Sequence, residues 1–179
     1  AAPVQNIGAY GVELSDVLKA VQVVELATGE MHWLNADACQ FGYRDSIFKR
    51  TLAGRVVITQ LALRLSATPR PVLGYGDLAA RVSESPTPLS VAQAVCAIRQ
   101  EKLPDPAVLA NAGSFFKNPL VSNEHTHRLL KEYPDMPYFP QPNNQTKLAA
   151  GWLIDQCGLK GARRGHVGVH AQQALVLVQ

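Results

Sequence analysis

An eight-residue string at positions 112–119, AGSFFKNP, places a hydroxyl, a cation and an amide around two aromatic rings. These groups are sufficient for a polar reaction beside a flat cofactor, with Ser114 as the hydroxyl. Gly113 lets the backbone approach a ligand closely, and Pro119 stiffens the exit from the string. A tight turn with a hydrophobic anchor is the alternative, because Gly, Ser, Asn and Pro are the common turn residues.

A second string, AAPVQNIGAYGVEL, occupies residues 1–14. Further strings are GYRDSIFK at 42–49, VLGYGDL at 72–78, IRQEKLPDP at 98–106, AAGWLIDQCGLKG at 149–161 and QALVLV at 173–178. Together and in this order, they resemble the bacterial flavoenzyme family of UDP-N-acetylenolpyruvoylglucosamine reductases, also called UDP-N-acetylmuramate dehydrogenases. The resemblance runs through essentially the whole chain. In that family the first string lines the flavin, and GSFFKNP carries a catalytic serine.

The resemblance implies an oxidoreductase of peptidoglycan precursor synthesis, and hence of cell wall biogenesis, cell shape and cell division. NADPH would reduce FAD, and the reduced flavin would pass hydride to the methylene carbon of UDP-N-acetylglucosamine enolpyruvate, giving UDP-N-acetylmuramate. A bacterial cytoplasmic location and a monomeric full-length protein are also implied. Family members are considerably longer, so we expect this chain to be an internal fragment. It would lack a pyrophosphate-binding loop and a late glutamate, and would show little turnover alone.

Hydride addition to an enol ether leaves negative charge delocalised toward the carboxylate, so the reaction needs a cation and an acid. By the resemblance, Ser114 is the proton donor and Arg44 is the catalytic cation. The permanent charge and forked donors of an arginine suit both a carboxylate and an enolate. From the residues alone, a surface ion pair of Arg44 with Asp45 or Asp37 is the stronger interpretation.

The resemblance also implies two sets of binding residues. The substrate-binding set is polar and consists of Tyr10, Tyr75, Lys102, Asn118, Lys147 and Gln173. Tyr75 would fold over the diphosphate as a lid, which indicates the subgroup with a tyrosine lid, and its flanking glycines give the loop freedom. The cofactor-binding set is small and apolar and consists of Val4, Ile7, Gly8, Ala9 and Ile58. Long cations at helix ends are more often solvated, and a buried turn is the alternative for the VQNIGAYG string.

Alternation and turn signals predict the strands that would position these residues. Residues 17–26 and 31–34 have the pattern of a hairpin whose ATGE turn supplies a glycine for the left-handed position. Residues 55–65 alternate well enough for a long half-buried strand. Two later strands are expected at 166–170 (HVGVH) and 174–178 (ALVLV).

Helix and loop signals complete the pattern. Ser90 and Gln93 match a capping box that opens a helix ending near Lys102. Asn35 could cap a short helix through Cys39, and Gly158 should close a later one. The remaining helices are expected at 44–50, 124–132 and 146–157, and loops at 66–76 and 136–144.

The string LPDP at 103–106 breaks regular structure twice and is the predicted domain boundary. We expect part of an FAD-binding domain at residues 1–103 and part of a substrate-binding domain at 104–179. The order of expected elements predicts mixed α and β structure, and with the resemblance the predicted fold class is α+β for both domains. A dinucleotide fingerprint is absent from the VQNIGAYG string, whose glycines lack the G-x-G-x-x-G spacing.

Composition narrows the classes of function. The chain has 179 residues, 47% of them hydrophobic, and its net charge of +3 comes from dispersed basic residues, which argues against nucleic acid. No apolar run approaches the roughly 20 residues needed to cross a bilayer. Three distant cysteines fit reduced cytosolic thiols. Two histidine pairs, in EHTHRLL and HVGVH, lack completing ligands at familiar spacing, so no metal site is expected.

Three interpretations remain open at the level of sequence. The first is a piece of an active flavin reductase. The second is a module that binds a sugar nucleotide without redox chemistry. The third is an inactive folding fragment, or a partner in assembly. Mass measurements and flavin fluorescence would separate the third from the others.

Overall fold

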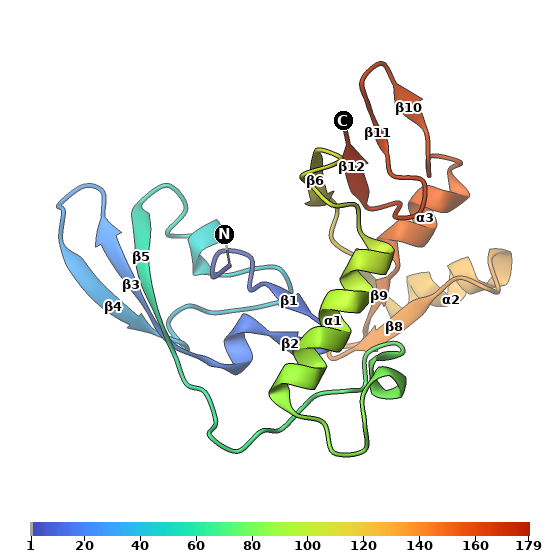
Figure 1. The fold of residues 1–179 in the computed structure, drawn as a ribbon. Helices are drawn as coiled ribbons and strands as arrows, with labels where there is room; N and C mark the ends of the chain where they lie inside the picture. Colours follow the sequence, from blue (N-terminus) through green and yellow to red (C-terminus); the bar gives the residue numbers. More distant parts are fainter. Residues whose placement is uncertain (1) are drawn as a thin grey trace. The chain divides into compact units, whose positions relative to one another are not determined.

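The computed structural model describes residues 2–179, and Ala1 at the start of the first string lies outside the described residues. The chain divides into two compact units, of which the first ends at Ala97 and the second runs from Ile98 to Gln179. Each unit combines small antiparallel sheets with short helices, so the predicted α+β class is confirmed (Figure 1). The predicted boundary between 103 and 104 stays a prediction.

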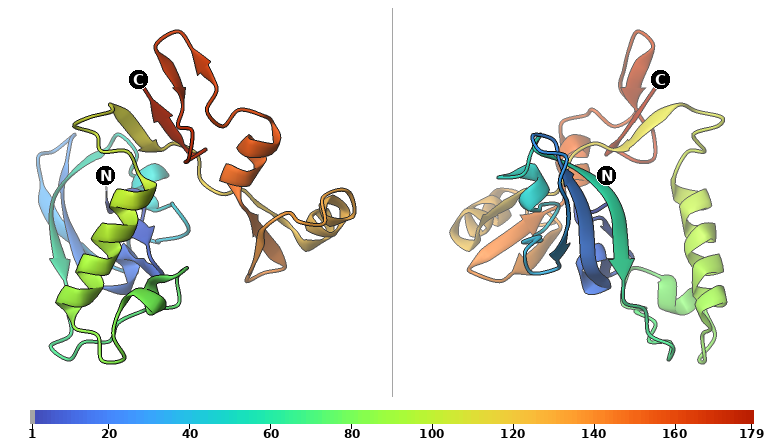
Figure 2. Two further views of the ribbon diagram at one scale, coloured as in Figure 1. Left: turned by 45° about the vertical axis from the view of Figure 1, so that its right-hand side comes forward. Right: turned by 90° about the vertical axis from the view of Figure 1, so that its left-hand side faces the viewer.

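The first unit is built around a three-stranded antiparallel sheet in the order β4-β3-β5 (Figure 2). Its strands are β3 (Leu18–Glu25), β4 (Met31–Asn35) and β5 (Val56–Leu63), which confirms the predicted hairpin and the predicted long strand. The central strand alternates, and its Val21 and Val23 are fully buried with Leu18, Cys39 and Phe48 in one core. The β3–β4 turn contains Gly29 at φ +74°, the left-handed residue that such a turn needs.

A small hairpin carries most of the first string. It consists of β1 (Gly8–Ala9) and β2 (Val12–Glu13), with Gly8 paired to Glu13. Tyr10 and Gly11 form its turn at φ +55° and +85°. Short 3-10 helices follow at η1 (Leu14–Asp16), η2 (Ile47–Lys49) and η3 (Leu78–Arg81). The helix predicted around RDSIFKR is therefore a single 3-10 turn.

Helix α1 (Pro88–Lys102) ends where the sequence predicted but begins three residues earlier than a cap at Ser90 implies. Thr87 is the capping residue: the backbone N–H of Ser90 donates to Thr87 Oγ1 at 3.1 Å, and the Thr87 N–H donates to Ser90 Oγ at 2.9 Å. The reciprocal bonds of a capping box are thus made by a serine in place of the usual glutamate or glutamine. Pro88 fits the first helical position because it has no N–H to satisfy.

The second unit contains two sheets, each antiparallel throughout. The first has the order β10-β11-β12-β6 and consists of β6 (Asn111–Ser114), β10 (Arg163–Arg164), β11 (Val167–Val169) and β12 (Val176–Val178). The second has the order β7-β9-β8 and consists of β7 (Leu120–Ser122), β8 (Tyr138–Gln141) and β9 (Gln145–Leu148). Helix α2 (Asn123–Glu132) follows β7 in the sequence, and helix α3 (Ala150–Gln156) lies between β9 and β10. The predicted late strands and the 124–132 helix are confirmed.

Three local predictions are wrong. Residues 136–144, expected as a loop, contain β8, in which Pro140 lies opposite Thr146, because an edge strand tolerates proline. The helix expected from 146 begins only at Ala150, since residues 145–148 pair with strands on both sides. Residues 36–40 form turns, although the Asn35 side chain does accept the Ala38 N–H at 2.8 Å.

Cys39 differs from the other two thiols. It is fully buried, whereas Cys96 and Cys157 are exposed. Burial raises the pKa of the Cys39 thiol from 9.0 to about 11. Because the thiolate is the reactive form, we expect a maleimide at pH 7 to modify Cys96 and Cys157 in the native protein, and Cys39 only after denaturation. Mass spectrometry counts the maleimide adducts. Rapid modification of all three cysteines in the folded protein would contradict the predicted protection of Cys39.

The same pKa shift has a consequence for stability. The unfolded Cys39 thiol ionises near pH 9.0 while the folded one stays neutral until about 11. Its stabilising contribution is therefore complete below pH 9 and is lost as the pH rises toward 11, by on the order of 2 kcal/mol. A Cys39→Ala variant serves as the control, because its unfolding free energy should fall less over this pH interval.

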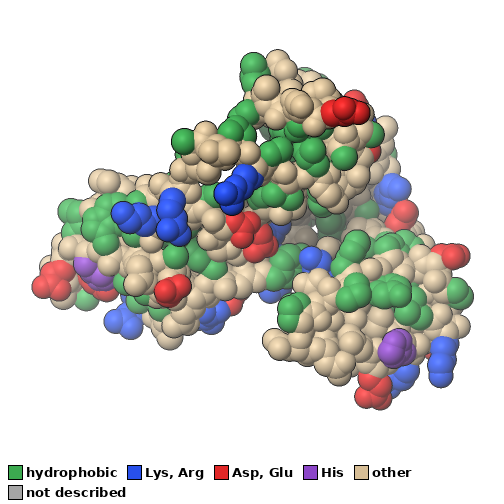
Figure 3. Space-filling view, turned by 90° about the horizontal axis from the view of Figure 1, so that it is seen from below, with side chains coloured by type: hydrophobic (Ala, Val, Ile, Leu, Met, Phe, Trp, Pro, Cys, Tyr) green, Lys and Arg blue, Asp and Glu red, His purple; other side chains and the backbone are tan. Residues whose placement is uncertain are grey.

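The distribution of charged side chains on the surface agrees with the modest net charge. Seen from below, the Lys and Arg side chains lie in separate small groups among hydrophobic and acidic ones (Figure 3). Among residues 2–179, no helix is both long and apolar enough to cross a membrane.

Candidate active site

Arg44 is held in the first unit by two backbone carbonyl groups of the first string, those of Asn6 and Gly8. Its Nη1 donates to the Asn6 carbonyl at 3.0 Å, and its Nη2 donates to the Gly8 carbonyl. The Glu13 carboxylate lies 3.5 Å from Nη1. The alternative ion pair with Asp45 is not formed, because Asp45 pairs with Arg50 instead. The structure therefore brings the proposed cation to the string that was predicted to line a cofactor.

Asn6 forms the centre of the same network. It is only 1% exposed, and its amide nitrogen donates to Glu13 Oε2 at 2.8 Å and to the Gly42 carbonyl at 3.1 Å. Its amide oxygen accepts the Ser15 N–H at 3.0 Å. One buried amide thus ties the hairpin β1–β2 to the turn that carries Arg44, and its burial is compensated by three hydrogen bonds.

Tyr10 and Tyr75 contact each other. Their rings lie 5.4 Å apart at 71°, an edge-to-face arrangement. A Cβ added at Gly11 would lie 3.0 Å from Val72 and 3.9 Å from Tyr75, so the GYG loop lies directly against the GAYG turn. Tyr75 is 56% exposed. Two of the predicted substrate-binding residues are therefore adjacent, in the same unit as Arg44.

The predicted cofactor-binding residues fall into two groups. Val4 and Ile58 line one cavity of ≈ 320 Å³, together with Phe48 and neighbouring apolar residues. Ile7 and Ala9 are exposed, and Ile7 is exposed by 57% despite its apolar side chain. Gly8 lies between them and contributes its carbonyl group to Arg44. The two groups therefore occupy a cavity and an exposed hairpin rather than one common pocket.

Ser114 lies in the second unit, at the end of β6 and opposite Val176. It is exposed, and Gly113 before it has φ +64°, a conformation that favours glycine. The Phe115 N–H donates to the Leu175 carbonyl at 2.9 Å, which fixes the backbone immediately after the serine. Phe115 and Phe116 stack edge to face at 5.2 Å and are both exposed.

The other predicted substrate residues have separate places in the second unit. Asn118 accepts the Ala150 N–H at 2.9 Å, which satisfies the first turn of α3, so this side chain has a structural task. Lys147, on β9, lies 5.8 Å from the centre of the Phe139 ring. Lys102 is exposed at the end of α1, and Gln173 is half-buried before β12.

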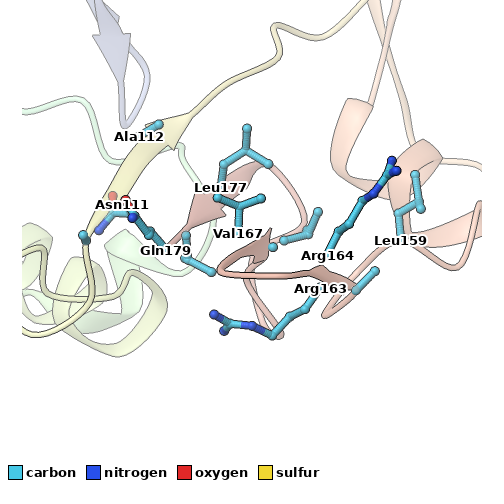
Figure 4. Close-up of a pocket in the computed structure, with 13 residues that line it drawn as sticks. Asn111, Ala112, Leu159, Arg163, Arg164, Val167, Leu177 and Gln179 are labelled. Atoms are coloured by element: carbon cyan, nitrogen blue, oxygen red, sulfur yellow. The ribbon is translucent and has the colours of Figure 1, made fainter.

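A larger pocket, of ≈ 770 Å³, lies among β6, β10, β11 and β12. Val167 and Leu177 contribute apolar side chains to its lining, and Arg163 and Arg164 are its charged residues (Figure 4). None of the predicted site residues lines it. Among the described residues, no group of three or more His, Cys, Asp or Glu side chains could hold a metal ion.

Sequence reasoning missed Asn6 and Glu13 as residues of this site. No pattern of charges or of spacing in the sequence links Asn6 or Glu13 to Arg44, which lies far along the chain. One signal was available: the amide of Asn6 and the carboxylate of Glu13 flank the mostly apolar, glycine-containing segment IGAYGV at 7–12. Such side chains in a compact turn need internal partners.

Comparisons with known proteins agree with the motifs. Residues 105–179 match the family model described as UDP-N-acetylenolpyruvoylglucosamine reductase, C-terminal domain. Proteins named UDP-N-acetylenolpyruvoylglucosamine reductase from Pasteurella multocida and Chromobacterium violaceum are each 55% identical, over 177 and 183 residues. These matches cover 99% of this chain and 52% and 54% of the relatives, so the chain spans about half the length of the curated relatives it matches.

A solved structure supports the fold. The crystal structure of UDP-N-acetylenolpyruvylglucosamine reductase from Thermus caldophilus is 25% identical, with a TM-score of 0.57. The match covers 99% of this chain and 48% of that one.

Proposed function

The chain is a relative of the UDP-N-acetylenolpyruvoylglucosamine reductases along essentially its whole length, and from this premise we propose that the gene product containing it is such a reductase. The substrate is UDP-N-acetylglucosamine enolpyruvate, and the product is UDP-N-acetylmuramate, a precursor of peptidoglycan in the bacterial cytoplasm. The observation that supports the proposal most directly is that Arg44 donates to the Asn6 and Gly8 carbonyl groups of the first string.

FAD and NADPH are the proposed cofactors. The residues of the first unit are compatible with a flavin, because the apolar side chains of Val4 and Ile58 line a cavity and the apolar Ile7 side chain is exposed. When bound and reduced by NADPH, the flavin supplies hydride to the enolpyruvyl methylene carbon. Val4, Ile7, Gly8, Ala9 and Ile58 are the residues of this chain that would contact it.

Two side chains would act on the substrate. Arg44 binds the carboxylate of the enolpyruvyl group and stabilises the negative charge that develops there, as a preorganised cation does at an oxyanion. Ser114 donates its hydroxyl proton to the carbon beside the carboxylate. Serine is a weak acid in water, so this role requires close placement, which Gly113 and the fixed backbone at Phe115 favour.

The remaining polar residues would hold the sugar nucleotide. Tyr75 is the lid over the diphosphate, and its contact with Tyr10 supports a shared role. The other members are Lys102, Asn118, Lys147 and Gln173. Asn118 also supports α3 through its hydrogen bond with the Ala150 N–H, so this side chain would combine a structural role with substrate binding.

An anaerobic visible spectrum of the complete gene product tests the proposal. Yellow protein that bleaches with NADPH, and regains colour only with UDP-N-acetylglucosamine enolpyruvate, is the expected result. UDP-N-acetylglucosamine, which lacks the enolpyruvyl group, is the matched control and should leave the flavin reduced. A protein that neither contains FAD nor can be reconstituted with it would instead favour the sugar-nucleotide-binding module.

A further inference from the structure

We propose that Glu13 and Asn6 are positioning residues for Arg44, which orient its guanidinium for the substrate carboxylate. The inference rests on the proposed function and deepens it, because it names what holds the catalytic cation in place. Glu13 contacts Arg44 Nη1 through Oε1 and the Asn6 amide through Oε2. The carboxylate therefore joins the buried amide and the cation in one network.

The backbone of Arg44 supports this role. Arg44 has φ +53°, in the left-handed region where glycine is favoured, and it lies in a tight turn closed by two hydrogen bonds between Gly42 and Asp45. A non-glycine residue there costs on the order of 1 kcal/mol. Asn6 has φ +40° and therefore has the same disadvantage. Two side chains of the network are thus kept at positions where glycine would be easier to accommodate.

Within residues 2–179, the neighbouring charges leave Glu13 as the acidic partner of Arg44. Asp45, next in the chain, pairs with Arg50, and the Arg50 guanidinium also donates to the Gln40 carbonyl at 3.0 Å. Arg44 therefore forms its ion pair with Glu13 and does not compete with Arg50 for Asp45. Because two carbonyls and one carboxylate occupy only part of a five-donor group, N–H donors remain for an anionic substrate.

Glu13 is also held by contacts with Asp16, which follows it closely in the chain. Its backbone N–H donates to Asp16 Oδ2 at 2.7 Å, and its side chain accepts the backbone N–H of Asp16 in a capping box. A carboxylate held by a helix cap, a buried amide and a cation has little rotational freedom. Its removal should therefore loosen Arg44 rather than merely remove a surface charge.

A double-mutant cycle in the complete gene product tests the inference. The variants are Glu13→Gln, Arg44→Ala and the double variant, and the rate measured is reoxidation of the reduced flavin by UDP-N-acetylglucosamine enolpyruvate. Glu13→Gln nearly preserves shape and keeps an acceptor for Asn6. We expect it to lower this rate about tenfold or more while NADPH reduction of the flavin and the melting temperature change little. Glu30→Gln, at an exposed carboxylate of the same unit, is the control.

The rate losses caused by Glu13→Gln and by Arg44→Ala should not multiply in the double variant. If Glu13 acts through Arg44, the double variant is no slower than Arg44→Ala. Multiplicative losses, or an unchanged rate in Glu13→Gln, would overturn the positioning role while leaving the reductase proposal in place. An absence of any flavin reoxidation by the substrate in the unmodified protein would overturn the proposed function itself, so the two failures are distinguishable.

Discussion

Replacement of Ser114 by alanine is expected to slow reoxidation of the reduced flavin by the enolpyruvyl substrate by about 10²-fold or more, the scale of a positioned general acid. Reduction of the flavin by NADPH should be nearly unchanged, because that half-reaction requires no proton for the substrate carbon. The change therefore separates the two halves of the catalytic cycle.

The structure makes this substitution a clean probe. Ser114 is exposed at the end of β6, and the described residues give its hydroxyl no hydrogen-bond partner. Removing the oxygen leaves the backbone bond from Phe115 to Leu175 intact. The free energy of unfolding should consequently change by less than about 0.5 kcal/mol.

Rapid-mixing absorbance at the flavin band measures both half-reactions in the complete gene product. Ser85→Ala, at another exposed serine without a hydrogen bond among the described residues, is the matched control and should behave as the unmodified protein does. Equal losses in both half-reactions would contradict the assignment of Ser114 as proton donor, since they would indicate a general disturbance of the flavin site.

Replacement of Gly8 by alanine is the second large effect that we expect. An added Cβ would lie 2.7 Å from Glu13 Cγ, 2.9 Å from the Val12 carbonyl oxygen and 3.0 Å from Arg44 Nη1. Rotation of side chains could relieve the first and third contacts, but the second is with the backbone of the paired strand. The hairpin must therefore shift, at a cost of about 1–3 kcal/mol in the free energy of unfolding.

We expect Gly8→Ala to affect the rate of flavin reoxidation more strongly than the stability of the fold. The atoms that must move include those of Glu13 and Arg44, and displacement of a catalytic group by about 1 Å can cost on the order of 10²-fold in rate. The measurements are the melting temperature and the rate of flavin reoxidation by the enolpyruvyl substrate, expressed per bound flavin.

Gly42→Ala provides the comparison within the same network. A Cβ at Gly42 would lie 3.8 Å from the Asp45 Cβ, an ordinary van der Waals contact, and the Gly42 carbonyl would remain available to Asn6. This variant should retain a substantially higher rate than Gly8→Ala. If both variants are equally active and equally stable, the close packing around Gly8 does not hold Arg44.

Much of the local structure could be predicted from the sequence. Strand β5 follows from alternation, since residues with period two place one side of a strand in a core. The hairpin of β3 and β4 follows from its turn glycine. Gly29 and Gly158 were identified as left-handed positions because only glycine adopts them without cost. The α+β class and the family resemblance followed from the same local order of strings.

Local signals failed where pairing with distant residues determined the structure. Residues 145–148 had the composition of a helix start, but hydrogen bonds to β7 and β8 favour the strand β9. The proline-rich segment 136–144 contains the edge strand β8 for the same reason. Propensity is weak compared with a complete set of interstrand hydrogen bonds and the burial of Thr146 and Leu148.

The sequence by itself determined which chemical groups are present and the family that they resemble: Ser114, Arg44 and the strings around them. Only the tertiary structure decided which partner each group has. Arg44 and Asp45 are adjacent in the chain, yet Arg44 contacts Glu13 and Asp45 contacts Arg50. The physical reason is that ion pairs and hydrogen bonds depend on distance in space, and the turn at Arg44 and the buried Asn6 amide set that distance.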